Sequence, residues 1–108
     1  MRVLLDNCTP RGVASGLRGH IVNECRSQAW DQLKNGELLD AAEVAGFDVF
    51  ITSDQNIRYQ QNLPRRKIAI IVLESAIWEF IRPHLKRIRA AVEAAEPGSF
   101  TKIPVLGE

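Results

Sequence analysis

The chain lacks several features that would assign it to a class at once. Its only cysteines are Cys8 and Cys25. They do not have the spacing of a zinc site, so neither a zinc module nor a disulfide framework is predicted. No apolar run approaches the length of a membrane span. The first apolar stretch ends at Asp6, far short of the core of a secretory signal. These absences predict a cytoplasmic protein with free thiols and no membrane partner.

An excess of one charge is also missing. Lys and Arg number 14 and Asp and Glu number 13, a formal net charge of +1. This balance neither marks a nucleic-acid-binding protein nor excludes one, because a basic surface can be local. The apolar share of 45% and the charged share of 25% are ordinary for a globular domain. One domain with one set of packed layers is therefore predicted over residues 1–108.

Short apolar runs alternate with helical patterns along the chain. The runs at residues 2–6, 48–53 and 67–73 predict buried strands, and the last is apolar on both faces, as in strands covered by helices on each side. Residues 20–25 mix apolar and polar side chains and predict an edge strand, as do residues 99–105. This alternation predicts an α/β, Rossmann-like domain with a mostly parallel sheet and helices on both faces.

Helix signals lie between these strands. Thr9 is the predicted N-cap of a first, glycine-weakened helix, and Asn35 that of a second helix, which Gly46 ends. A third block covers residues 75–95, and Pro83 is expected to break it into a short and a longer helix. This block carries one apolar stripe, formed by Ile77, Ile81, Leu85, Ile88, Val92 and Ala95.

Two of the predicted strands end in an aspartate. Asp6 closes the first strand, and Asp54 follows the strand that ends in Thr52 and Ser53. Parallel sheets bind ligands beyond the carboxyl ends of their strands, at a switch in strand order, so we expect both carboxylates there. Glu37, in the first turn of the preceding helix, is expected to reach the same place. Three such acids favour a hard divalent cation, Mg²⁺ or Mn²⁺.

Each acid also has a purely structural explanation. Asp6 and Asp54 each precede a predicted helix, where aspartate is a common N-cap. Glu37 in a first helical turn interacts favourably with the helix dipole. The coincidence of all three favours the metal site over these separate roles. Asp40, three residues after Glu37, is a candidate fourth ligand because it would share its helix face.

Four segments of the chain occur in the order and spacing of a known family. They are the strand that ends in Asp6 with the turn at Pro10, residues 33–39, residues 51–56, and the strand at 68–73. Together they resemble the PIN-like proteins that often sit in toxin–antitoxin operons. The resemblance covers roughly residues 1–95.

This resemblance implies a compact Rossmann-like PIN fold and metal-dependent hydrolysis of RNA phosphodiesters. It implies that Asp6, Glu37 and Asp54 are both the catalytic residues and the ligands of Mg²⁺ or Mn²⁺. It further implies the toxin of a toxin–antitoxin pair, with an antitoxin protein as partner, and it allows a homodimer.

The polar segment before the third buried strand is the candidate RNA surface. Arg58, Arg65 and Arg66 accompany Tyr59, whose ring can stack on a base. Asn56 is expected to orient substrate or water. The structural alternative is an ordinary solvated segment with Tyr59 packed inward.

Other function classes compete with the nuclease. A PIN-like module that binds RNA or protein without turnover is favoured by Asn35 and Asn56, which stand where many relatives carry acids. A phosphoacceptor receiver domain would need paired acids after the first strand, where only Asp6 is present. A catalytic thiol at Cys8 is disfavoured because no histidine is expected beside it.

Overall fold

The computed structural model describes residues 1–55, 57 and 66–105. Within these residues the chain forms a five-stranded, all-parallel sheet in the order β2-β1-β3-β4-β5. The predicted α/β fold with a mostly parallel sheet is thereby confirmed. The strands are β1 (Arg2–Leu5), β2 (Ile21–Glu24), β3 (Val49–Thr52), β4 (Ala69–Leu73) and β5 (Phe100–Ile103).

The order of the strands reverses beside β1. β2 pairs with one side of β1, and the chain then crosses back so that β3 pairs with the other side. The carboxyl ends of β1 and β3 are therefore neighbours at a topological switch point. We call the edge of the sheet formed by the carboxyl ends of its strands the carboxyl edge. β2 and β5 are the outer strands of the described sheet, as predicted for residues 20–25 and 99–105.

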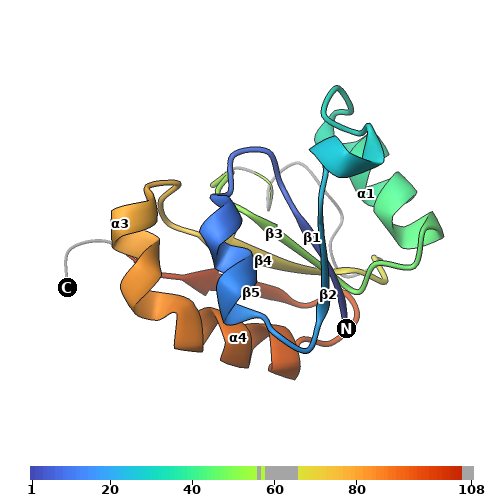
Figure 1. The fold of residues 1–108 in the computed structure, drawn as a ribbon. Coiled ribbons are helices and arrows are strands. Elements are labelled where there is room, and N and C mark those ends of the chain that lie inside the picture. Colours follow the sequence, from blue (N-terminus) through green and yellow to red (C-terminus); the bar gives the residue numbers. More distant parts are fainter. Residues whose placement is uncertain (56, 58–65, 106–108) are drawn as a thin grey trace.

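Helices cover both faces of the sheet (Figure 1). In the described part of the chain no helix is long and apolar enough to cross a membrane. The face covered by α1 (Asn35–Val44) also receives the connection that contains η2 (Arg26–Gln28). The other face is covered by η1 (Arg11–Gly16), α3 (Trp78–Ile81), η4 (Arg82–His84) and α4 (Leu85–Ala94).

Alternation along the strands gives one apolar core on each face. Val3 and Leu5 of β1 belong to the core under α4, whereas Leu4 belongs to the core under α1. β4 contributes residues to both cores and is buried along its whole length. This is the environment that its continuous apolar run predicts, because both of its faces are covered by helices.

The region after β1 differs from the sequence prediction. Thr9 is not an N-cap, because its buried hydroxyl donates to the carbonyl of Ile51 in β3, at 3.2 Å. Pro10 occupies the cap position of η1, which is a 3-10 helix. Gly12 is required by close packing, since a Cβ there would lie 2.4 Å from the Trp78 ring.

The later helices follow the prediction more closely. Pro83 lies in η4, which separates α3 from α4 as expected. Gly46 has a φ of 88° directly after the cap of α1, the conformation of a C′ glycine. Two details of the helix prediction are wrong. Lys34, not Asn35, is the N-cap of α1. Ile77 is 51% exposed because it precedes α3 in extended conformation and so leaves the apolar stripe.

Glu43 of α1 fixes the start of β4. Its carboxylate accepts hydrogen bonds from the backbone N–H groups of Lys67 and Ile68 and from the guanidinium of Arg66. Burial alone would raise the pKa of the Glu43 carboxyl, but these donors outweigh burial and hold that pKa below its ordinary value. The ionised carboxylate therefore stabilises the fold above the pKa that Glu43 has in the unfolded chain. This stabilisation is lost as the pH falls through the lower folded value.

Replacing Glu43 with glutamine should expose this contribution. We expect Glu43→Gln to lower the free energy of unfolding by about 1–3 kcal/mol near neutral pH, because hydrogen bonds to a charged group are lost. The difference from the parent should shrink in acid, where Glu43 itself is protonated. Urea unfolding at several pH values measures both effects. The exposed Glu79→Gln is the control, and a pH-independent difference at Glu43 would contradict this account.

Candidate functional site

Asp6 lies directly after β1, at the switch point. Its Oδ2 accepts a hydrogen bond of 2.6 Å from the hydroxyl of Thr52, and its Oδ1 accepts one of 2.8 Å from the backbone N–H of Asn7. Its own backbone N–H donates to the carbonyl of Ile51 at 2.9 Å and so extends the pairing of β1 with β3. The carboxylate is therefore held in one orientation at the carboxyl edge, where it remains partly exposed.

The hydroxyl of Thr52 connects the two strand-end aspartates. Thr52 is fully buried, and its Oγ1 donates to Asp6 while it accepts from the backbone N–H of Asp54 at 3.1 Å. Asp54 is itself partly buried and engaged in further interactions. The structure thus places both predicted aspartates at adjoining strand ends, joined through one side chain.

Glu37 lies in the first turn of α1 and is exposed. Its Oε1 accepts from the backbone N–H of Lys34 over a long 3.5 Å, a contact to the start of its own helix. The connection leading to α1 passes beside the switch point, because the Asn7 amide donates to the carbonyl of Asp31 at 3.3 Å. Among the described residues no three His, Cys, Asp or Glu side chains are grouped so as to hold a metal ion. The three-acid ligand set stays a prediction.

The remaining predicted residues fall into two groups. Asp40, the candidate fourth ligand, pairs with Arg66, which also contacts Glu43. The Arg66 side chain is only 16% exposed and ties α1 to the start of β4, so its predicted role in RNA binding stays a prediction. Four residues of the candidate RNA surface lie outside the described residues: Asn56, Arg58, Tyr59 and Arg65.

Two polar side chains for which no role was predicted from the sequence connect strand ends at the carboxyl edge. Gln55 donates through Nε2 to the carbonyls of Leu73 and Ser53, at 2.6 and 3.0 Å. The hydroxyl of Ser53 donates to the carbonyl of Ser75 at 3.0 Å. These bonds join the end of β3 to the end of β4. The available signal was the run of polar residues from Thr52 onward, which interrupts an otherwise apolar strand.

The two cysteines are not activated nucleophiles. Cys25 is buried, and burial raises the pKa of its thiol to about 12. Cys8 is exposed as a whole residue but its thiol is partly covered, and its Sγ lies 3.5 Å from Oδ2 of Asp6. Partial burial, and more weakly the Asp6 carboxylate, raise the pKa of the Cys8 thiol as well. Both side chains therefore remain neutral thiols near neutral pH, and a neutral thiol is a poor nucleophile.

Comparison with known proteins does not assign a function to this site. The chain matched no family model, no curated protein and no solved structure. The resemblance to PIN-like proteins therefore depends on the sequence motifs, and the site is interpreted from its own geometry.

Replacing Thr52 with valine keeps the shape of the side chain and removes its hydroxyl. Asp6 then loses a donor and the N–H of Asp54 loses an acceptor, so we expect the free energy of unfolding to fall by about 1–3 kcal/mol. The matched control is Thr101→Val in the outer strand β5, where Thr101 is partly exposed. Thr101→Val should change the free energy of unfolding by no more than about 0.5 kcal/mol. Equal losses in urea unfolding would show that the Thr52 hydroxyl has no special role.

Alkylation should distinguish the two thiols. In the folded protein iodoacetamide should modify Cys8 slowly, because its raised pKa leaves little thiolate, and should leave Cys25 unmodified. In urea both should react. Mass spectrometry of peptides measures the two rates, and fast modification of Cys25 in the folded protein would contradict its burial.

Proposed function

We propose that this protein is a Mg²⁺- or Mn²⁺-dependent ribonuclease of the PIN-like kind, which hydrolyses phosphodiesters at the carboxyl edge. The observation that carries the proposal is the hydroxyl of Thr52, which links the Asp6 carboxylate to the backbone N–H of Asp54 across the two strand ends at the switch point. A carboxylate oriented at such a point of a parallel sheet is suited to a charged ligand.

Carboxylate oxygens are the donors that a hard divalent cation prefers. Mg²⁺ keeps several waters and commonly takes one or two protein carboxylates together with phosphate oxygens of its substrate. Asp6 and Asp54 would supply these carboxylates, and Glu37 would join them if its side chain left the long contact with Lys34. A bound ion supplies an acidified water and offsets the charge that develops on the phosphate.

The chain itself supplies orientation. The hydroxyl of Thr52 and the N–H of Asn7 already fix both oxygens of Asp6, so that little reorganisation is needed when a ligand arrives. Ser53 and Gln55 hold the neighbouring strand end in place. A site preorganised in this way is what electrostatic catalysis requires.

The proposal extends to the biological role that the resemblance implies, a cytoplasmic toxin restrained by an antitoxin. An exposed apolar pair supports a protein partner, since Ile77 is 51% and Phe80 42% exposed. Trp78, which lies between them in the chain, packs against Gly12 and the core under α4.

A second candidate is a PIN-like module that binds RNA or protein without turnover. It is favoured by one observation, namely that the described residues hold no group of three acids, cysteines or histidines arranged for a metal. A module of this kind would keep the fold and the carboxyl edge but would neither depend on divalent ions nor cleave RNA.

The substitution Asp6→Asn separates the two candidates. For the ribonuclease, Mn²⁺ should stabilise the parent by about 2.7 kcal/mol at a hundredfold excess over its dissociation constant, because only the folded chain binds it. The parent should cleave a mixed RNA pool with Mn²⁺ present. Asp6→Asn should lose both effects while circular dichroism shows an intact fold. Thermal melts measure the stabilisation by Mn²⁺, and gel electrophoresis measures the cleavage of RNA.

The exposed Glu96→Gln serves as the control and should behave as the parent. A smaller Mn²⁺ effect in Glu37→Gln would add Glu37 to the ligands. If the melt of the parent ignores Mn²⁺ and the RNA pool stays intact, the ribonuclease proposal fails and the binding module replaces it.

A further inference from the structure

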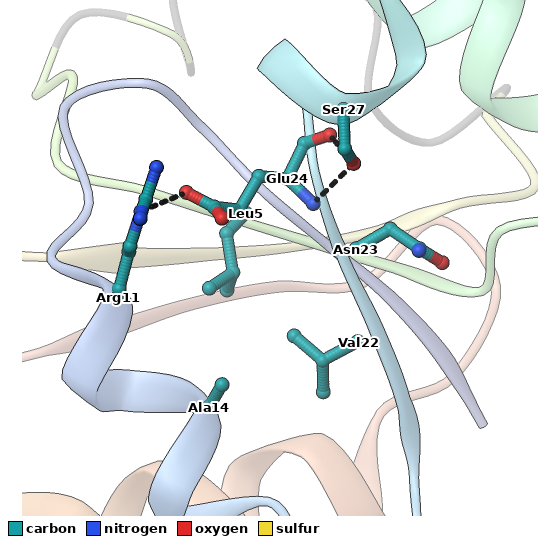
Figure 2. A pocket seen from close by; sticks show the side chains of 7 residues that line it. All are labelled: Leu5, Arg11, Ala14, Val22, Asn23, Glu24 and Ser27. Atoms are coloured by element: carbon teal, nitrogen blue, oxygen red, sulfur yellow. Dashed lines mark hydrogen bonds and ion pairs between the residues drawn. The ribbon is translucent and has the colours of Figure 1, made fainter.

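A pocket of about 300 Å³ lies between η1 and the outer strand β2, beside the carboxyl edge (Figure 2). The volume is at the lower end of the range of small-molecule sites. On its inner side the apolar side chains of Leu5, Ala14 and Val22 point toward one another, and the ion pair of Arg11 with Glu24 spans it above them. The pocket thus offers an apolar slot with a charged lip.

The ion pair at the mouth of the pocket contributes little to the stability of the fold. Nε of Arg11 donates to Oε1 of Glu24 at 3.1 Å, but the two side chains are 74% and 37% exposed. Exposed pairs of this kind contribute little to folding. Only Nε and Oε1 have a hydrogen-bond partner among the described residues, so the terminal nitrogens of Arg11 and Oε2 of Glu24 are available. The pair presents donors next to an acceptor, which is the chemistry needed to bind a polar heterocycle.

Glu24 is also held in place through its backbone. The hydroxyl of Ser27 accepts from the N–H of Glu24 at 3.2 Å and donates to its carbonyl at 2.7 Å. The backbone N–H groups of Ile21 and Cys25 point to β1. Backbone groups alternate in direction along a strand, so the N–H and the C=O of Glu24 point outward. Ser27 therefore occupies the outward N–H and C=O of Glu24, next to the pocket, which disfavours strand addition at this end of β2 and favours a ligand bound by side chains.

The pocket lies at the same edge of the sheet as the proposed active site. Leu5 directly precedes Asp6, and Glu24 is the register partner of Leu5 in β2. The Leu5 side chain faces the core under α4, whereas the Asp6 carboxylate bonds Thr52 on the α1 side, so an RNA chain that crosses the carboxyl edge reaches both. Single-stranded RNA is bound in this manner, with unstacked bases against flat or apolar surfaces and polar groups on their Watson–Crick edges.

We propose that this pocket is a nucleobase subsite that prefers guanine; the proposal rests on the ribonuclease function and adds its substrate preference. Guanine alone among the four bases presents two adjacent donors, N1–H and the N2 amino group, beside an acceptor, O6. The carboxylate of Glu24 accepts from the two donors, and the guanidinium of Arg11 donates to O6. The ring packs on Ala14 and Val22, above the buried Leu5.

Nucleotide binding without metal tests the subsite separately from catalysis. The four ribonucleoside 5′-monophosphates are titrated, with EDTA present, into isotope-labelled protein and followed by the backbone amide NMR signals. GMP should bind most tightly and shift the signals of Leu5, Val22 and Glu24. Glu24→Gln should weaken GMP binding about tenfold or more, because a good bidentate contact to a base edge is lost.

Matched variants make the result decisive. The exposed Glu79→Gln and Arg82→Gln are controls and should bind GMP as the parent does, whereas Arg11→Gln should weaken it. Asp6→Asn should keep GMP binding, so a failed ribonuclease and a failed subsite give different outcomes. Equal shifts by all four nucleotides would mean that the pocket senses phosphate or ribose. That result, shifts confined to other residues, or unchanged GMP affinity in Glu24→Gln would overturn the proposal.

Discussion

A threonine hydroxyl buried between two parallel strands holds the carboxyl edge together. Thr52 ends a strand whose other residues are apolar and buried, and a polar group in that setting needs partners for both its donor and its acceptor. The Asp6 carboxylate accepts a hydrogen bond from the hydroxyl, and the backbone N–H of Asp54 donates one to the hydroxyl oxygen. The orientation of the Asp6 carboxylate follows from this requirement.

Other acidic side chains of the chain stabilise the fold, and their surroundings differ from those of Asp6. Glu43 is surrounded by backbone N–H groups and Arg66, so that its charge is satisfied within the fold. Asp48 accepts from the backbone N–H of Arg2 at the opposite edge of the sheet. Asp6 instead receives only part of the donors it can use and remains partly exposed at the switch point. An acid placed in this way is available to a ligand, whereas Glu43 is not.

The sequence predicted those features that depend on local pattern. The buried strands, the two outer strands and the break at Pro83 follow from the period of apolar residues and from the chemistry of proline, which need no knowledge of distant contacts. The strand-end positions of Asp6 and Asp54 follow in the same way. The features that could not be predicted depend on tertiary neighbours. Thr9 caps no helix because its hydroxyl donates to a carbonyl of β3. Arg66 points to α1 because it pairs there with the carboxylates of Asp40 and Glu43. The pocket beside β2 likewise exists only once η1 packs over the outer strand.

Paramagnetic broadening can locate the divalent ion proposed at Asp6 and Asp54. Traces of Mn²⁺ added to isotope-labelled protein broaden the amide NMR signals nearest to the bound ion. We expect the signals of Asp6, Asn7 and Asp54 to disappear first and to return when excess Mg²⁺ competes. Broadening centred on Asp40 and the helix α1, or uniform broadening without a preferred site, would show that no ion binds at these two aspartates.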